Sequence, residues 1–281
     1  MPLPAQPTIL VTGATDGLGR AVAERLIDDG ASVLVHGRDA DRLEATAREL
    51  RERAGDEGRV QPFRADFARL ADVRGLAVEV ARQVDRLDVL INNAGIGSGL
   101  PDSPNRQESE DGYELRFAVN YLATFVLTLG LLPMLRDSAP ARVVMVSSIG
   151  QAPIDFDDPQ IEHGYSGARA YGQSKLAQIT FANELARRVP PDELTANSLH
   201  PATYMPTKIV LETVGHSIDT LEEGVEATVR LATSPELDGV TGEFFDRERP
   251  ARADAQAYDE QAAERLWQLS LALTGVPDST I

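Results

Sequence analysis

The sequence predicts an α/β fold in which a doubly wound parallel sheet carries helices on both faces. Short β-branched runs such as TILVT (8–12) alternate with longer segments of helical spacing such as GRAVAERLIDDG (19–30). The expected strands are continuous apolar runs, which is typical of strands that are buried on both faces. Because strand and helix alternate from the first residues onward, a parallel sheet is favoured over an antiparallel one.

The expected elements follow one another closely along the chain. SVLVH (32–36) is expected to form a strand, and ADRLEATARELRERAG (40–55) an amphipathic helix that ends in glycine. Further strands are expected at 59–65, 87–95, 141–148, 194–199 and 241–245, and further helices near 69–84, 112–136, 168–189, 218–232 and 258–274. We expect a single domain over 1–281, with a lid at about 200–215 and a C-terminal extension at about 246–281.

Composition limits the partners of the chain. Its net charge of -17 argues against nucleic acid and anionic membrane surfaces, since both are polyanions. It has no cysteine, and its four histidines show no metal-ligand spacing, so no metal site is expected. The N-terminus lacks the pattern of a signal peptide, and the most apolar stretch (121–135) is too short to span a bilayer. We therefore expect a cytoplasmic protein without a membrane partner, acting on a small molecule.

A glycine-rich turn follows the first expected strand. In TGATDGLG (12–19) the glycines allow a sharp turn into a helix, where backbone amides can approach a diphosphate. The alternative is a plain strand–helix turn, but its place after the first strand favours nucleotide binding. The spacing Gly-x3-Gly-x-Gly resembles that of the short-chain dehydrogenase/reductase family, which implies a Rossmann-type fold. The cofactor contacts expected here are Gly13, Thr15, Asp16, Gly17, Leu18 and Gly19.

The end of the second expected strand bears on the choice of nicotinamide cofactor. A carboxylate there would bond the ribose hydroxyls of NAD and repel the 2′-phosphate of NADP. This chain has Gly37 followed by Arg38, whose guanidinium can make paired bonds to a phosphate. Asp16 and Asp39 weigh the other way, and Arg38 could instead cap a surface loop. We expect NADP(H) to be preferred over NAD(H).

Tyr171 and Lys175 lie four residues apart in an expected helix, so both side chains share one face. An ammonium group favours the phenolate and is expected to lower the pKa of the phenol, which makes tyrosine a usable acid or base. Such a pair also occurs by chance on exposed helices. It gains weight here because Ser147–Ser148 end the preceding strand and Asn120 lies upstream in a long helix.

The family resemblance implies a role for each of these residues. Ser148 would hydrogen-bond the substrate carbonyl, with Ser147 as the fallback. Asn120 would support a water that links Lys175 to solvent. In reduction, hydride passes to the carbonyl carbon while Tyr171 protonates the oxygen.

The resemblance also implies further cofactor contacts. Asp66 would contact the adenine, and the NNAG segment would pack under the adenosine through Asn93, Ala94 and Gly95. In HPATYMPTK (200–208), Thr203 and Thr207 are both candidates to hold the nicotinamide carboxamide. The remaining expected contacts are Phe67, Pro201, and the catalytic Tyr171 and Lys175.

Two segments indicate a particular branch of the family. FDD…GYS…RAYGQSKLA and the tail FFDRERPARADAQAYDEQAAERLWQLSLALTG are similar to the retinol-dehydrogenase-like and WW-domain-oxidoreductase-like branch. The long segment between Ser148 and Tyr171 is expected to wall the site, and the substrate is expected to be a moderately apolar alcohol or carbonyl compound. The alternatives are a catalytically silent nucleotide-binding sensor or scaffold, and an epimerase or dehydratase that uses transient oxidation. The sequence does not decide between a monomer and a homo-oligomer.

Overall fold

A computed structural model describes residues 2–99, 105–207, 210–211 and 215–278 of the chain. Part of the expected lid, at 208–209 and 212–214, lies outside the described residues. Lys208, the last residue of HPATYMPTK, falls in that part.

The strands form one sheet of eight, in the order β3-β2-β1-β4-β5-β6-β7-β8. They are β1 (Thr8–Val11), β2 (Ser32–Gly37), β3 (Val60–Arg64), β4 (Val89–Asn92), β5 (Ala141–Val146), β6 (Leu194–His200), β7 (Phe244–Asp246) and β8 (Arg249–Ala251). Every neighbouring pair is parallel except β7–β8, which is antiparallel. The predicted α/β class is confirmed. The strand β8 was not expected, because three residues with a proline carry too little apolar pattern.

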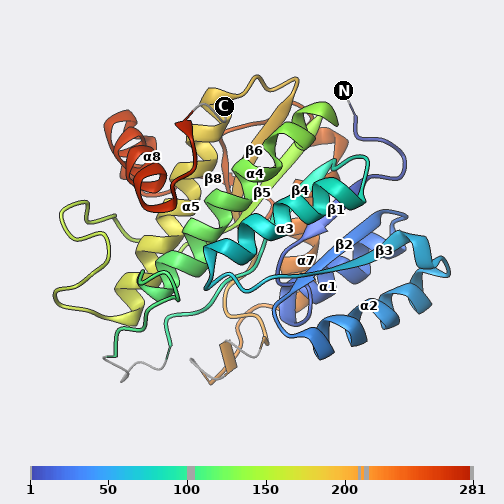
Figure 1. Ribbon diagram of the computed structural model, residues 1–281, viewed down its shortest axis with the longest axis horizontal. Helices are drawn as coiled ribbons and strands as arrows, with labels where there is room; N and C mark the ends of the chain where they lie inside the picture. Colours follow the sequence, from blue (N-terminus) through green and yellow to red (C-terminus); the bar gives the residue numbers. More distant parts are fainter. Residues whose placement is uncertain (1, 100–104, 208–209, 212–214, 279–281) are drawn as a thin grey trace.

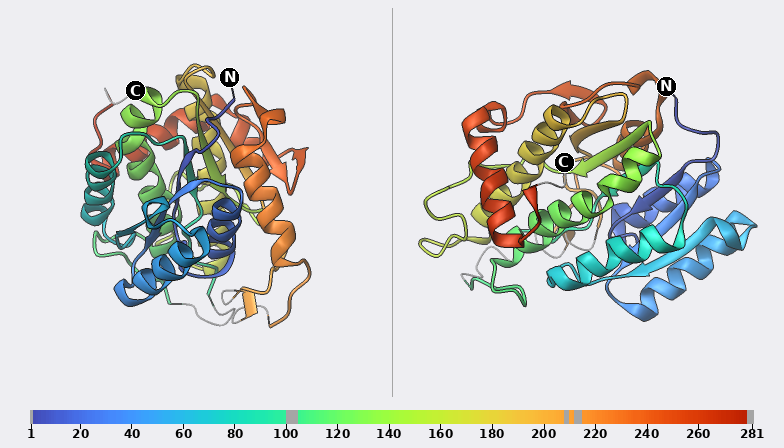
Figure 2. Two further views of the ribbon diagram at one scale, coloured as in Figure 1. Left: turned by 90° about the vertical axis from the view of Figure 1, so that its right-hand side faces the viewer. Right: turned by 45° about the horizontal axis from the view of Figure 1, so that its top comes forward.

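Helices cover both faces of the sheet (Figures 1 and 2). The helices α1 (Gly17–Asp28), α2 (Ala40–Ala54) and α7 (Leu221–Thr233) contribute to the apolar core on one face. The helices α3 (Leu70–Gln83), α4 (Ala123–Asp137) and α5 (Gly167–Arg188) contribute to the core on the other, and α8 (Glu260–Thr274) packs against α5. As predicted, α2 ends at a glycine, Gly55, which takes a left-handed conformation.

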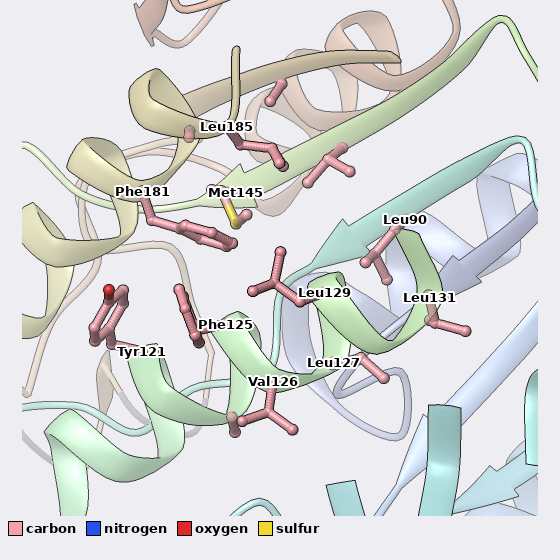
Figure 3. Packing of buried hydrophobic residues seen from close by; sticks show 14 of the residues in the cluster. Leu90, Tyr121, Phe125, Val126, Leu127, Leu129, Leu131, Met145, Phe181 and Leu185 are labelled. Atoms are coloured by element: carbon pink, nitrogen blue, oxygen red, sulfur yellow. The ribbon is translucent and has the colours of Figure 1, made fainter. Parts of the chain in front are cut away.

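The most apolar helical segment lies in the core. A π-helical turn, Phe117–Leu122, leads into α4, and together they are long and apolar enough to cross a membrane by length and composition. However, 78% of the apolar window is buried inside the protein. Figure 3 shows Phe125 and Leu129 pointing toward Met145 of β5 and Phe181 of α5. This burial is expected of a core helix, whose apolar side chains pack against the rest of the protein.

The strand order brings the predicted site residues to one edge of the sheet. The chain leaves β1 toward β2 on one side, whereas β4 lies on the other side of β1, so the connections diverge at this point. Ligands of such sheets bind in the crevice beyond the carboxyl ends of the strands at this reversal. The glycine turn follows β1, NNAG follows β4, Ser147–Ser148 follow β5, and Pro201 follows β6.

Candidate active site

Close backbone contacts fix the glycine-rich turn. Gly13 has a φ of +66°, and a Cβ there would lie 2.9 Å from Ala94 Cα. A Cβ on Gly19 would lie 2.3 Å from the Gly13 carbonyl oxygen. Asp16 caps α1 by accepting the Gly17 N–H at 2.7 Å. The contacts at Gly13 and Gly19 thus leave no space for a Cβ, and the amides at the start of a helix such as α1 favour an anion.

His36 supports this turn and was not predicted from the sequence. The Gly13 N–H donates to His36 Nδ1 at 3.2 Å, so Nε2 carries the proton and donates to the Ala65 carbonyl oxygen at 3.1 Å. Burial lowers the pKa of His36 to about 4, so the neutral ring that this arrangement needs prevails at neutral pH. The signal in the sequence is a histidine that ends an apolar strand, directly before Gly37.

Phe67 lies beneath this histidine. Its ring stacks on the His36 ring with centroids 4.4 Å apart, and it is buried. The side chain of this predicted cofactor contact therefore belongs to the core. Leu18, another predicted contact, is also buried in the core on the α1 side of the sheet.

The end of β4 joins the glycine turn to α5, which carries Tyr171 and Lys175. Thr12 Oγ1 accepts the N–H groups of Asn93 and Ala94, each at 2.9 Å, and Asn93 Nδ2 donates to the Thr12 carbonyl oxygen at 2.8 Å. A Cβ on Gly95 would lie 3.2 Å from Asn120 Oδ1 and 3.7 Å from Lys175 Nζ. The predicted cofactor segment thus reaches the predicted catalytic residues.

The end of β2 presents a guanidinium group. A Cβ on Gly37 would lie 2.5 Å from Thr15 Cγ2, so these two predicted residues are packed together. Arg38 is exposed, and no ion pair involves it within the described part of the chain. The carboxylate of Asp39 instead caps α2 by accepting the Arg42 N–H at 2.9 Å. Asp66, the predicted adenine contact, is partly exposed and accepts the Ala68 N–H at 3.0 Å.

The predicted catalytic pair shares one face of α5. Lys175 Nζ lies 5.7 Å from the centroid of the Tyr171 ring, and the Tyr171 hydroxyl is hydrogen-bonded with Ser148. Ser147 is buried, and its Oγ donates to the Lys175 carbonyl oxygen at 2.8 Å. The structure therefore places Ser148 beside the phenol and uses Ser147 to tie β5 to α5.

Asn120 sits in the π-helical turn before α4 and is fully buried. Its Nδ2 donates to the Ile96 carbonyl oxygen at 3.1 Å and to Ser174 Oγ at 3.0 Å, and its Oδ1 accepts the Ile96 N–H at 2.8 Å. The side chain thus connects the segment after β4 to α5. Single π-turns of this kind are frequent at functional sites.

The electrostatics correct one prediction. Burial raises the pKa of Tyr171, and the nearby Tyr204 adds to the rise, while the hydrogen bond with Ser148 opposes it. Burial also lowers the pKa of Lys175 to about 7. The expected lowering of the phenol pKa is therefore wrong for the protein by itself, because a poorly solvated site disfavours the ammonium as well as the phenolate.

The segment after β6 separates the two candidate threonines. Pro201 is buried directly after the strand. Thr203 Oγ1 bonds with His200 Nε2 at 3.0 Å and accepts from Arg247 Nη2 at 3.4 Å. In contrast, Thr207 Cγ2 lies 3.2 Å from where a Cβ on Gly17 would be. Thr203 thus belongs to a hydrogen-bond network at the base of the segment, whereas Thr207 lies against the glycine turn.

Comparisons with known proteins show which family the chain belongs to. The sequence model of the short chain dehydrogenase family matches residues 7–214. Retinol dehydrogenase 14 of Homo sapiens is 38% identical over 295 residues, covering 96% of this chain and 86% of the relative.

Solved structures share the fold. A crystal structure of a protein from Mycobacterium paratuberculosis has a TM-score of 0.78 at 32% identity, covering 98% of this chain and 96% of that one. The RhlG/NADP active-site complex from Pseudomonas aeruginosa has a TM-score of 0.70 at 27% identity, covering 87% of this chain and 95% of that one.

The chain belongs to the short-chain dehydrogenase family, in its retinol-dehydrogenase-like branch. It is an NAD(P)-dependent oxidoreductase that acts on an alcohol or a carbonyl group. The predicted family and enzyme class are confirmed.

Proposed function

We propose that this enzyme uses NADP(H) to interconvert an alcohol and a carbonyl on a moderately apolar small molecule, with Tyr171 as the proton donor and acceptor. The observation that carries the proposal is the meeting of Ser148, Tyr171, Lys175 and Asn120 beside the glycine turn. A silent nucleotide-binding sensor would have no use for this arrangement.

The side chains divide the work around the reacting oxygen. The cofactor, when bound, supplies or takes up the hydride. Ser148 and Tyr171 can both donate hydrogen bonds to the substrate oxygen, where negative charge develops. The raised pKa of Tyr171 keeps the phenol protonated, which suits reduction. In oxidation the phenolate must form, and Lys175 is the cation within reach that favours it.

Three observations support NADP(H) as the cofactor. Arg38 is exposed at the end of β2, and the competing carboxylate of Asp39 is engaged in capping α2. Independently of the choice between NADP and NAD, which share the same nicotinamide end, we assign the contact with that end to Thr207 rather than to Thr203, because Thr207 lies at the glycine turn. The Pseudomonas aeruginosa neighbour was solved with NADP.

Exposed apolar side chains around the catalytic residues support an apolar substrate. Of the five large hydrophobic side chains that are most exposed in the described chain, four belong to this region: Ile149, Tyr204, Leu211 and Ile218. Ile149 follows Ser148, and Tyr204 is close enough to affect the pKa of Tyr171. The Ile218 N–H bonds to the Tyr204 carbonyl oxygen at 3.0 Å, and the Leu211 N–H to that of Thr207 at 2.9 Å. Exposed apolar side chains that lie on neighbouring segments are typical of a ligand-binding surface.

We also propose a cytoplasmic location without a membrane partner. The support is that the most apolar helix of the described chain is mostly buried in the core of the protein.

The test replaces Tyr171 with phenylalanine and follows NADPH oxidation with a panel of apolar and polar ketones and aldehydes. We expect kcat to fall about 1,000-fold, since a positioned acid–base group contributes about 10²–10⁴-fold. The NADPH dissociation constant should stay within about twofold, because the hydroxyl is removed and the ring is kept.

The matched control is Tyr113→Phe, since the Tyr113 hydroxyl donates to the Leu273 carbonyl oxygen at 2.6 Å, in contact with α8 rather than with the catalytic residues. This variant should turn over at the wild-type rate. Unchanged turnover in Tyr171→Phe would overturn the proposed role of the tyrosine, and turnover of polar substrates only would overturn the substrate class.

A further inference from the structure

A buried glutamine contacts the catalytic lysine. Gln178 lies on α5, three residues after Lys175, and its side chain is fully buried. Its Oε1 accepts a hydrogen bond from Lys175 Nζ at 2.9 Å. Its Nε2 is buried and has no hydrogen-bond partner among the residues that the structure describes. A buried amide that is only half satisfied is costly, so the contact with Lys175 is the interaction that explains a polar residue here.

The contact fixes the direction of the ammonium group. Lysine has a long flexible side chain and three N–H donors. Two donors of Lys175 are used by the protein, one by Gln178 Oε1 and one by the Val146 carbonyl oxygen, each at 2.9 Å. With two bonds set, the direction of the third N–H follows from tetrahedral geometry. On the proposed function, that third donor is left for the ribose of the cofactor.

The contact also stabilises the charge of Lys175. Burial lowers the pKa of this lysine, and no carboxylate of the described chain contributes to its shift. The groups that face it are neutral: Tyr171 on the same helix, Asn120 and Gly95 from the neighbouring segments, and the end of β5. Tyr171 is the one titratable group among them. The two carbonyl oxygens of Gln178 and Val146 accept hydrogen bonds from Nζ, and bonds to the charged form of a group favour that form.

We propose that Gln178 is a positioning residue that orients the Lys175 ammonium group and keeps it charged beside Tyr171. This inference rests on the proposed function for its catalytic meaning, but the contact itself can be measured without turnover.

The chain offers a direct readout because it contains only two lysines, Lys175 and Lys208. Protein labelled with ¹³C at lysine Cε gives two resonances, and Lys208→Arg removes one of them, which assigns the other to Lys175. The chemical shift of that resonance against pH gives the midpoint of Lys175 titration in each variant.

Three substitutions at this position predict different shifts. Gln178→Leu removes the acceptor at similar volume, so the Lys175 midpoint should fall by about one pH unit. Gln178→Glu places an anion against the ammonium, so the midpoint should rise by about one to two pH units. Gln178→Asn shortens the side chain by one methylene and moves its oxygen away from Lys175 Nζ. The Lys175 midpoint should then fall less than in Gln178→Leu.

The control is Thr180→Val on the same helix. Thr180 is buried, and its hydroxyl has no hydrogen-bond partner among the described residues, so it forms no hydrogen bond with Lys175. Its loss should leave the Lys175 midpoint unchanged. If circular dichroism shows that Gln178→Leu does not fold, Gln178→Glu and Gln178→Asn decide, because their shifts have opposite signs.

Turnover links the contact to catalysis. If charged Lys175 is needed, kcat/KM for carbonyl reduction falls as the pH rises. In Gln178→Leu this fall should begin at a pH about one unit lower than in the wild type. Equal Lys175 midpoints in the wild type, Gln178→Leu and Gln178→Glu would overturn the inference. Shifted midpoints without any oxidoreductase activity would leave the contact standing and overturn the proposed function instead.

Discussion

The glycine turn after β1 and the segment after β6 lie at the same edge of the sheet but are held in different ways. The turn is held by backbone contacts: the Gly13 N–H donates to His36, the Asn93 side chain donates to the Thr12 carbonyl oxygen, and Gly19 lies against the Gly13 carbonyl. These contacts leave room for no side chain larger than hydrogen at Gly13 and Gly19.

The segment after β6 is held at its base instead. The N–H groups of Ile218 and Asp219 donate to the carbonyl oxygens of Tyr204 and Thr203, each at 3.0 Å. Asp219 accepts the Thr203 N–H at 2.6 Å and pairs with Arg247, and these bonds hold the pKa of Asp219 below its usual range. Beyond this base, Leu211 is exposed and Tyr204 has a φ of +47°.

The difference matches two proposed binding roles, with the cofactor at the glycine turn and the substrate at the segment after β6. A diphosphate is common to all cofactors of this class, so its site can be built rigidly from backbone. Substrates differ, so on the proposed function the segment after β6 would present side chains to the substrate from a base that only anchors it. Substitutions in the turn should therefore affect cofactor binding strongly, and substitutions at the base of the segment should affect substrate binding weakly.

The largest effect is expected for Gly19→Ala. The new methyl would lie 2.3 Å from the Gly13 carbonyl oxygen, so the turn must open. We expect the NADPH dissociation constant, measured by fluorescence titration, to rise at least about 100-fold, or about 2.8 kcal/mol.

Gly75→Ala serves as its control. Gly75 lies in α3, and nothing is within 4 Å of its added Cβ. This change should leave NADPH affinity intact and stabilise the fold by about 0.5–1 kcal/mol. If both alanines bind NADPH equally well, the turn is not a cofactor site.

A smaller effect is expected for Arg38→Ala. This variant tests whether the end of β2 distinguishes NADPH from NADH. Loss of a charge-assisted bond to the 2′-phosphate should weaken NADPH binding about 10–30-fold and leave NADH binding unchanged. Arg48→Ala removes the same charge from an exposed position on α2 and should change neither. Equal losses for NADPH and NADH in Arg38→Ala would contradict the proposed cofactor preference.

The smallest effect is expected for Asp219→Ala at the base of the segment. The partly exposed pair with Arg247 and the bond from Thr203 are lost, so the segment should loosen and KM for the substrate should rise about three- to fivefold. NADPH affinity should change little. Glu236→Gln, which breaks an exposed pair with Arg230, is the control and should leave both quantities unchanged. A loss of NADPH affinity as large as that of Gly19→Ala would erase the distinction between the two regions.

Much of the fold and site could be predicted from the sequence because the signals are local. Apolar periodicity marks strands and helices, glycine spacing marks the turn, and a spacing of four residues places Tyr171 and Lys175 on one face. The strand β8 escaped prediction because its three residues show no pattern and pair only through β7. His36 escaped because its partners, Gly13 and Ala65, are 23 and 29 residues away along the chain.

The sequence by itself determined the α/β alternation, the family and the candidate catalytic residues, since each depends on neighbours along the chain. The tertiary structure decided which of two nearby candidate residues lies at each position of the site. It placed Ser148 at the phenol and bound Ser147 to α5, and it set Thr207 against the glycine turn. It also reversed the expected shift of the Tyr171 pKa. The physical reason is that burial and hydrogen-bond partners come from distant segments, and only the folded chain brings them together.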